Sequence, residues 1–272
     1  MNGKQLRIQK LFNNSENTVI IAIDHGMFDG PITGMTDLKK TAERINPDVD
    51  GVLLSPGMLK RFHYIFNFKG APIPIVRLNW SSVYCFHWNY NKAYTVIAQT
   101  VEEAVSNGAE IVLASLTLQT GSEENDTRNV EVYSRLVNEA DKMGIPIIGE
   151  FFPAYSDTIS SDQLYEQVYS GCRILSELGC DIIKTFYTIN FKDVTESCPV
   201  PILGLGAEKK PTQIEALQLA SSEIKDGAHG VVFGRNAIQV KNPFAFQAAL
   251  CDVVKKNIDP TEAFMKHNLS EI

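Results

Sequence analysis

Short apolar runs recur along the chain, each followed by a polar turn and a longer amphipathic stretch. The runs are nearly continuous rather than alternating, as expected for parallel strands that helices cover on one side. Eight strands are therefore predicted, at Thr18–Asp24, Gly51–Ser55, Ile73–Leu78, Ile111–Leu116, Ile145–Phe151, Asp181–Lys184, Val200–Leu205 and Gly230–Gly234. Helices are predicted in the amphipathic stretches, at Thr100–Asn107, Asn129–Met143, Ser161–Leu178, Thr212–Asp226 and Pro243–Lys256.

Eight strand–helix units in 272 residues leave about 34 residues for each, enough for a strand, a helix and a return crossover. This predicts one α/β domain over residues 1–272, a (β/α)₈ TIM barrel with a short N-terminal helical segment before the first strand. A doubly wound sheet is the main alternative. It is disfavoured because Asp24-His25-Gly26 follows the first strand, where that fold carries GxGxxG. In a barrel, chemistry belongs at the carboxyl ends of the strands.

Composition narrows the class of protein. Apolar residues are 44% of the chain and charged residues 21%, which excludes a disordered or fibrous protein. With 25 basic and 32 acidic residues the net charge is −7, so no nucleic-acid partner is expected. No apolar run approaches the roughly 20 residues of a membrane helix, and no secretory signal opens the chain. A cytoplasmic protein without a membrane partner is expected.

Metal and thiol chemistry find no support in the sequence. Carboxylates and histidines do not cluster at metal-ligand spacing. The five cysteines form no CxxC pair and are scattered along the chain, at Cys85, Cys172, Cys180, Cys198 and Cys251. They are expected to be reduced and packed rather than catalytic.

Lys184 ends an apolar run and lies at the mouth of its predicted strand. Partial burial disfavours the charged form of a lysine, and a neutral lysine is a nucleophile that forms Schiff bases with carbonyls. The alternative is a strand-end lysine that extends to solvent or pairs with a carboxylate. Polar residues follow it directly, at Thr185, Tyr187 and Thr188, and favour a functional role.

Two carboxylates, those of Glu150 and Asp24, also lie on predicted strands. Glu150 lies inside the apolar run of the preceding strand, where a carboxylate must be paired or neutral. It is a candidate general acid/base facing Lys184, or one half of a structural ion pair. Asp24 closes the first strand, where it can accept a proton and orient hydroxyls, or only cap its loop. Tyr155, in the loop after the Glu150 strand, is a further source of a phenol at the same mouth.

Glycine-containing exits follow the last two strands. Gly206 and Ala207 precede Lys209, and Gly234 precedes Arg235. Glycines let backbone N–H groups approach an anion, and barrels often bind phosphate after strands seven and eight. The sequence therefore predicts a phosphate site at these two exits.

Three further polar segments are less specific. His25 follows Asp24 and either contacts a ligand or forms hydrogen bonds within its loop. Arg77 ends the third strand together with Asn79, Trp80 and Ser81, and either lines the pocket wall or belongs to a tight turn. The acidic run at residues 123–126 is expected to be a solvated loop.

Three motifs, IDHGMFDGPITGM at 23–35, DIIKTFYT at 181–188 and VVFGRNAIQ at 231–239, stand in order along the chain. Together with the glycine-containing exit before Lys209, these motifs resemble the archaeal-type class I fructose-bisphosphate aldolases. That family belongs to the DeoC/LacD-like aldolases, which also include the aminodideoxyheptulosonate synthases and the autoinducer-2 phosphate thiolase. The resemblance runs from about Asn13 to Asn257. It implies a barrel that breaks or forms C–C bonds through a covalent lysine Schiff base, without metal or other cofactor. It also implies a homo-oligomer such as a pentamer or decamer.

Carried over by motif, Lys184 matches the Schiff-base lysine and Asp24 the first-strand acid, while Gly206, Ala207, Gly234 and Arg235 match the phosphate-binding segments. The family's tyrosine acid/base is replaced by Phe152, whose ring cannot transfer a proton. Glu150 is the preferred substitute because its setting is similar to that of the strand-five glutamate in tagatose-bisphosphate-type aldolases, and Tyr155 is second. The strand-seven exit also reads GLGAEK, where the family commonly has two adjacent glycines before Pro-Lys.

The leading hypothesis is a class I aldolase that acts on a phosphorylated ketose, like fructose-bisphosphate aldolase. Lys184 forms the iminium, Glu150 or Asp24 removes the hydroxyl proton, and the strand-seven and strand-eight loops hold phosphate. An acyl transferase of the thiolase type would use the same lysine. A sugar-phosphate-binding barrel without turnover is the alternative from a different class, because fold alone does not fix function.

Overall fold

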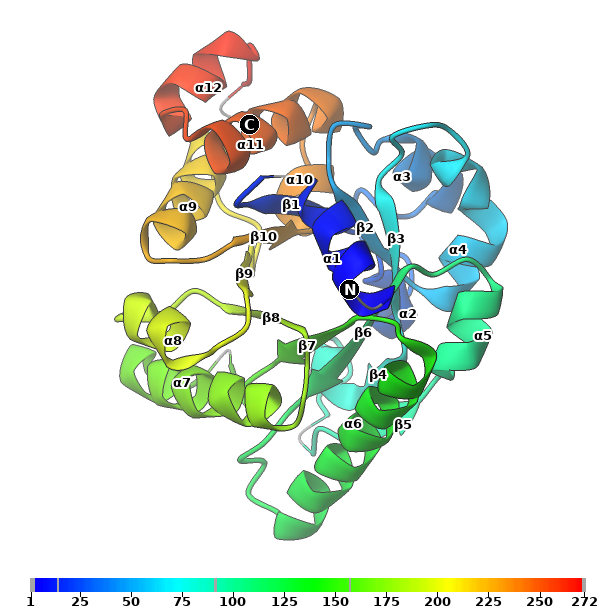
Figure 1. The fold of residues 1–272 in the computed structure, drawn as a ribbon. Helices are drawn as coiled ribbons and strands as arrows, with labels where there is room; N and C mark the ends of the chain where they lie inside the picture. Colours follow the sequence, from blue (N-terminus) through cyan, green and yellow to red (C-terminus); the bar gives the residue numbers. More distant parts are fainter. Residues whose placement is uncertain (1–2, 14, 91, 157, 271–272) are drawn as a thin grey trace.

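The chain folds into a closed parallel barrel, as a computed structural model shows (Figure 1). The structure describes residues 3–13, 15–90, 92–156 and 158–270, so the first two residues of the predicted N-terminal segment lie outside the described part. The barrel strands follow the order β1-β10-β9-β8-β7-β6-β3-β2. Their bounds are β1 Thr18–Ala22, β2 Gly51–Leu54, β3 Ile73–Arg77, β6 Ile111–Leu116, β7 Ile147–Phe151, β8 Ile182–Phe186, β9 Ile202–Leu205 and β10 Gly230–Phe233. The TIM-barrel prediction is confirmed.

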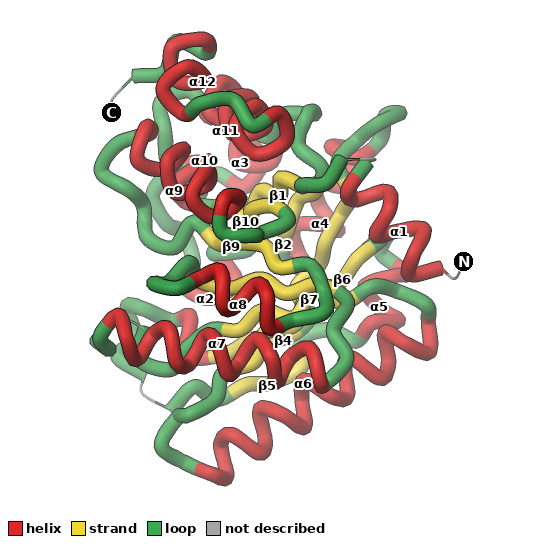
Figure 2. The backbone as a smooth tube through the Cα atoms, turned by 60° about the vertical axis from the view of Figure 1, so that its left-hand side comes forward, coloured by secondary structure: helices red, strands yellow, loops and turns green. Residues whose placement is uncertain are grey.

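Most helices surround the barrel on its outer side, whereas α1 (Gly3–Phe12) lies across one end of it (Figures 1 and 2). Several begin where the sequence predicts: the side chains of Thr100, Ser160 and Thr212 each form a capping box at the start of their helix. The helices are α1 Gly3–Phe12, α2 Gly26–Asp29, α3 Leu38–Glu43, α4 Pro56–Phe62, α5 Val101–Ser106, α6 Glu123–Met143, α7 Ser161–Glu177, α8 Phe191–Ser197, α9 Gln213–Lys225, α10 Arg235–Ile238, α11 Pro243–Lys256 and α12 Pro260–Lys266. Short 3₁₀ turns occur at η1 His63–Phe66 and η2 Ser82–Tyr84.

The acidic run at residues 123–126 is not a solvated loop, so that prediction is wrong. It forms the first turn of α6, and the Ser122 side chain accepts a hydrogen bond from the backbone N–H of Asn125 at 3.3 Å. Acidic residues are favourable there because the helix dipole is positive at its N-terminus. A helix start that is rich in Glu and Asp resembles a polar loop when only its composition is considered.

A hairpin that the sequence does not reveal is inserted between β3 and β6. Its strands β4 (Asn79–Ser81) and β5 (Thr95–Ile97) pair antiparallel, outside the barrel sheet. Asn79 anchors the hairpin to β6, because its side-chain oxygen accepts from the Ser115 N–H at 2.9 Å and its amide donates to the Ser115 carbonyl at 2.7 Å. The segment between the two strands carries Tyr84 and Phe86 to the mouth of the barrel.

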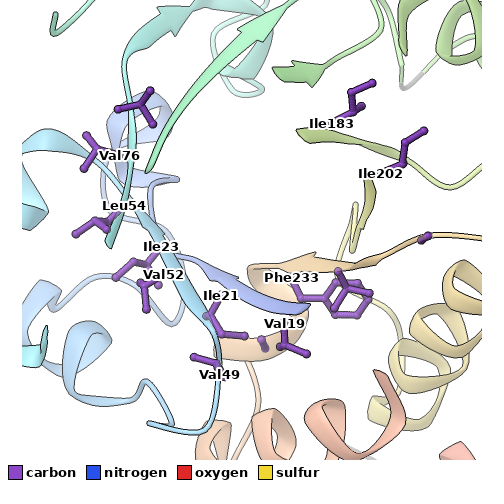
Figure 3. Close-up of a cluster of buried hydrophobic side chains, with 14 of the residues drawn as sticks. Val19, Ile21, Ile23, Val49, Val52, Leu54, Val76, Ile183, Ile202 and Phe233 are labelled. Carbon is purple, nitrogen blue, oxygen red and sulfur yellow. The ribbon is translucent and has the colours of Figure 1, made fainter. Parts of the chain in front are cut away.

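Alternate residues of each strand point to two different layers. The outer layer lies between strands and helices and includes Val19, Ile21 and Val52, part of which Figure 3 shows. The inner layer fills the barrel with residues such as Ile20, Ile75, Ile148 and Ile182, and Leu11 of α1 packs into it. Side chains alternate along a strand, so the residue two positions after each of these inner residues also points into the barrel, closer to its carboxyl end.

One buried carboxyl lies outside the barrel interior. Glu223 of α9 is fully buried, and neither of its carboxyl oxygens has a hydrogen-bond partner among the described residues. A Cβ added to Gly204 of β9 would lie 2.3 Å from its Cδ, so the carboxyl packs directly on the strand. Burial raises the pKa of Glu223 well above its usual range, against the opposing charge of Lys210. The folded protein therefore favours the protonated carboxyl.

We expect Glu223→Gln to stabilise the protein in a pH-dependent way. The unfolded glutamate ionises above its pKa of about 4.3 while the folded one stays protonated to higher pH, so wild-type stability falls as pH rises through this window. Glutamine keeps the shape without titrating. In thermal melts the variant should match wild type near pH 4.5 and exceed its Tm by roughly 2–4 °C at pH 7.5, the shift that about 1 kcal/mol produces in a protein of this size. An equal difference at both pH values would contradict the assignment.

Candidate active site

Four charged side chains converge on the axis at the carboxyl end of the barrel. Asp24 follows β1, Arg77 ends β3, Glu150 lies in β7 and Lys184 lies in β8. Each continues the inward series of its strand, two residues after Ala22, Ile75, Ile148 and Ile182 respectively. The sequence pattern that buries the core thus also directs all four functional groups to one point.

Arg77 is the centre of this cluster. Its Nε donates to Asp24 Oδ2 at 2.5 Å, and its Nη2 donates to Glu150 Oε2 at 2.5 Å. Lys184 Nζ lies 2.5 Å from the other oxygen of the same carboxylate, Glu150 Oε1. The register of β7 and β8 pairs Glu150 with Lys184, so the expected proximity of the two arises between neighbouring strands. Two cations and two carboxylates balance in charge, as burial requires.

The cluster is almost fully desolvated: Arg77, Asp24, Glu150 and Lys184 are 2%, 4%, 1% and 6% exposed. Burial acts to raise the pKa of Glu150, but the charges of Arg77 and Lys184 outweigh it and lower that pKa. The pKa of Asp24 is lowered in the same way, with burial opposed chiefly by Arg77. Both carboxyl groups are therefore held as carboxylates.

Tyr84 is a member of the site that sequence reasoning missed. Its hydroxyl donates to Glu150 Oε2 at 2.8 Å, and its ring lies 4.8 Å from the Arg77 guanidinium carbon. Burial and the Glu150 charge raise the pKa of this phenol well above its usual range, so the phenol remains a hydrogen-bond donor. Its ring centroid is 4.5 Å from that of Phe152. No motif marks Tyr84, because the β4–β5 hairpin brings it to the site.

The loops after β9 and β10, where the sequence predicts a phosphate site, lie side by side and are joined by hydrogen bonds. The guanidinium Nη2 of Arg235 donates to the Ala207 carbonyl at 2.9 Å. Asn236, a second residue not predicted, joins the two loops: its amide donates to the carbonyls of Gly206 at 2.7 Å and Glu208 at 3.0 Å. Arg235 Nε is buried and has no hydrogen-bond partner among the described residues, so one donor of the guanidinium remains unused.

Gly234 is required by close packing. A Cβ at this position would lie 2.3 Å from His25 Cε1, so only glycine lets the β10 exit approach the loop after β1. His25 Nδ1 is 3.8 Å from Asp24 Oδ1. Burial lowers the pKa of His25 to about 4, although Asp24 opposes the shift. The imidazole is therefore neutral near pH 7, and its buried Nδ1 has no hydrogen-bond partner among the described residues.

These groups line one cavity of about 600 Å³ at the mouth of the barrel. It brings together nearly all the predicted site residues, namely Asp24, His25, Arg77, Glu150, Lys184, Gly206, Ala207, Lys209, Gly234 and Arg235. Tyr155 borders a neighbouring cavity instead, with its side chain 47% exposed and its hydroxyl donating to the Thr120 carbonyl at 3.2 Å. Within the described residues, no group of three or more His, Cys, Asp or Glu side chains is arranged to hold a metal ion.

Comparison with known proteins agrees with this geometry. A sequence model of the DeoC/LacD family aldolases matches residues 18–240. An uncharacterised aldolase of Saccharolobus solfataricus is 32% identical over 268 residues, which cover 97% of this chain and 98% of the relative. A 3-hydroxy-5-phosphonooxypentane-2,4-dione thiolase of Klebsiella pneumoniae is 29% identical over 264 residues, 96% of this chain and 84% of the relative.

Solved structures give the same result. An archaeal fructose 1,6-bisphosphate aldolase matches with a TM-score of 0.76 and 25% identity, and a Schiff-base-forming fructose-1,6-bisphosphate aldolase with 0.78 and 26%. Each match covers 92% of this chain and 98% of the other. Fold and site together define a lyase of the class I, lysine-dependent type. The chain belongs to the DeoC/LacD family of aldolases. In the described part of the chain, no helix is both long and apolar enough to cross a membrane.

Proposed function

We propose that this protein is a class I aldolase that breaks or forms a C–C bond in a phosphorylated ketose, through a Schiff base on Lys184. The observation that carries the proposal is the buried contact of 2.5 Å between Lys184 Nζ and Glu150 Oε1 at the carboxyl end of the barrel. The fructose-bisphosphate aldolases with similar structures support this substrate class. In one of them, the catalytic lysine is covalently bound to the carbinolamine intermediate of the substrate.

The proton steps follow from the Lys184–Glu150 contact. Glu150 accepts a proton from the ammonium, and the neutral amine attacks the C2 carbonyl, so that a C–N bond forms. The attacking nitrogen passes one proton to the former carbonyl oxygen, which gives the carbinolamine. Glu150 then returns its proton to the same oxygen, which leaves as water, so that an iminium and a regenerated carboxylate remain. The C3–C4 bond then breaks, its electron pair moves toward the iminium nitrogen to give an enamine, and the C4 hydroxyl proton passes to Glu150 or Asp24. An aldehyde is released, and water frees the lysine after the enamine is protonated.

The phosphate group belongs beside β9 and β10 in this proposal. Gly206, Ala207 and Gly234 line the cavity there and present backbone N–H groups to it. Arg235 has a guanidinium N–H without a hydrogen-bond partner among the described residues, and Lys209 adds a positive charge. We expect Arg235→Met to raise the KM for a phosphorylated ketose by about 10–100-fold, the loss typical of a charged hydrogen bond, with a smaller effect on kcat. Steady-state kinetics with fructose 1,6-bisphosphate would measure this, with Arg173→Met on the exposed face of α7 as control. A fall in kcat at unchanged KM would place phosphate elsewhere.

An acyl transfer reaction of the thiolase type is the second candidate, favoured by the relatives named 3-hydroxy-5-phosphonooxypentane-2,4-dione thiolase. It would use the same lysine, but would need a thiol acceptor such as coenzyme A. Turnover of a phosphorylated diketone that depends on coenzyme A, without cleavage of phosphoketoses, would favour it. A binding barrel without turnover would retain ligand binding when Lys184 is replaced by methionine, and would show no reaction in either assay.

The remaining parts of the proposal concern the setting of the enzyme. We propose a cytoplasmic homo-oligomer, a pentamer or decamer, that needs no cofactor besides the lysine Schiff base and has neither nucleic acid nor membrane as a partner. The test of the whole proposal is borohydride trapping with dihydroxyacetone phosphate and fructose 1,6-bisphosphate, followed by peptide mass mapping. A reduced adduct on Lys184 supports it. An adduct elsewhere, or binding without any adduct, contradicts it.

A further inference from the structure

The two oxygens of the Glu150 carboxylate have different neighbours. Oε2 accepts hydrogen bonds from Arg77 Nη2 at 2.5 Å and from the Tyr84 hydroxyl at 2.8 Å. Oε1 faces Lys184 Nζ at 2.5 Å. Each oxygen of an ionised carboxylate offers about two lone pairs to donors. Arg77 and Tyr84 therefore occupy both lone pairs of Oε2, whereas Oε1 is the oxygen beside the lysine.

Both donors on Oε2 keep their protons near pH 7. The guanidinium of an arginine does not lose its proton in proteins, so Arg77 remains a donor. Burial and the charge of Glu150 raise the pKa of the Tyr84 phenol well above its usual range. Oε2 is therefore a permanent hydrogen-bond acceptor. A proton that reaches Glu150 goes to Oε1, where Lys184 can supply it and take it back.

The surroundings of Tyr84 fix the position of its hydroxyl. Its ring packs against those of Phe28 and Phe152, at 4.6 and 4.5 Å between centroids, and the residue is 6% exposed. The hydroxyl also forms a hydrogen bond with the side chain of Ser115. Ser115 of β6 is the register partner of Glu150 on β7, so the phenol is tied to both strands. A hydroxyl held in this way also restricts rotation of the carboxylate that it binds.

We infer that Tyr84 is a positioning residue for Glu150: together with Arg77 it holds Oε2, so that proton exchange with Lys184 is confined to Oε1. The inference rests on the proposed function and adds to it a residue of the β4–β5 hairpin. The ammonium of Lys184 transfers a proton to Oε1, and the electron pair of the broken N–H bond stays on the nitrogen that attacks the carbonyl. Oε1 later returns this proton to the oxygen that leaves as water. Tyr84 keeps its own proton throughout and acts only through Glu150.

The experiment is a double-mutant cycle of Tyr84→Phe and Glu150→Gln. Its readouts are kcat and KM for fructose 1,6-bisphosphate and the rate of adduct formation with dihydroxyacetone phosphate, followed by timed borohydride trapping and mass analysis. Phenylalanine keeps the ring contacts and removes only the hydroxyl. We expect Tyr84→Phe alone to lower kcat and the adduct rate by about tenfold, the loss typical of a hydrogen bond to a charged group, with KM within about threefold of wild type. In the Glu150→Gln background the same change should alter both rates by less than about twofold, because that side chain no longer accepts a proton.

The cycle separates positioning from a merely structural role. A structural role would lower the rates by the same factor in both backgrounds, and this additive result would overturn the inference, as would wild-type rates or a rise in KM alone in Tyr84→Phe. Tyr94→Phe is the matched control, because Tyr94 lies directly before β5 of the same hairpin, is 46% exposed and should react like wild type when changed. If the wild-type protein forms no adduct on Lys184, the proposed function fails and this inference with it. A normal wild-type adduct together with additive effects overturns the inference alone.

Discussion

Replacement of Lys184 by methionine should abolish covalent trapping and lower turnover by at least about a thousandfold. Methionine keeps the length and the apolar stem of the side chain but has no nitrogen to form an iminium, so the route through the enamine is lost. The measurement is twofold: cleavage of fructose 1,6-bisphosphate, and borohydride reduction with dihydroxyacetone phosphate followed by mass analysis. A variant that keeps more than a tenth of wild-type turnover would exclude Lys184 as the Schiff-base residue.

The control for this variant is Lys192→Met. Lys192 lies on α8 with its side chain 70% exposed, and its nearest ion-pair partner is Glu196 on the same helix. It should retain normal turnover and normal trapping. Thermal melts of both variants are needed as well, because Lys184 forms a buried pair with Glu150 and its loss leaves that carboxylate with Arg77 and Tyr84 as partners. A fall in Tm without a fall in turnover would assign Lys184 a purely structural role.

The second large effect is expected at Glu150. Glu150→Gln keeps the shape and the hydrogen-bonding capacity of the side chain but cannot accept the proton of Lys184 or of the substrate hydroxyl. Loss of a general base lowers kcat by about 10²–10⁴-fold. Single-turnover kinetics would locate the loss in adduct formation, in C–C cleavage or in both, because the carboxylate serves both steps.

Tyr155→Phe is the matched comparison, since it removes a phenol that borders a neighbouring cavity. Its turnover should remain within a few-fold of wild type. The assignment of Glu150 fails if Glu150→Gln turns over near-normally while Tyr155→Phe loses activity. Tyr84→Phe adds information on the same network: it removes the 2.8 Å hydrogen bond to Glu150 Oε2 and leaves the aromatic contacts with Phe28 and Phe152 in place.

Much of the site followed from the strand pattern alone. Once the apolar runs were assigned to parallel strands of a barrel, their carboxyl ends had to meet on one face, and Asp24, Glu150 and Lys184 had to lie there. Glu150 and Lys184 are in contact because the strand register places them opposite each other on β7 and β8. The order of the two segments along the chain already implies that these strands are neighbours. The glycine exits after the last two strands were predictable for the same reason.

Other features depended on contacts between segments distant in sequence. Tyr84 is 66 residues from Glu150, and only the β4–β5 hairpin brings its hydroxyl to the carboxylate. The apolar periodicity of the sequence also predicts neither the start of α6 nor the hydrogen bonds by which Asn236 joins two loops. Helix caps and contacts between loops produce no repeating pattern of apolar residues.

The sequence by itself determined the barrel, its polar mouth and the lysine, since side-chain alternation and apolar burial are local properties that recur in every strand. Only the tertiary structure decided how the charges pair and what surrounds them. Arg77 joins two carboxylates from different strands, and aromatic rings from four separate loops and strand ends pack into one wall. Both results depend on distances across the barrel mouth, which closure of the eight strands sets and no short segment encodes.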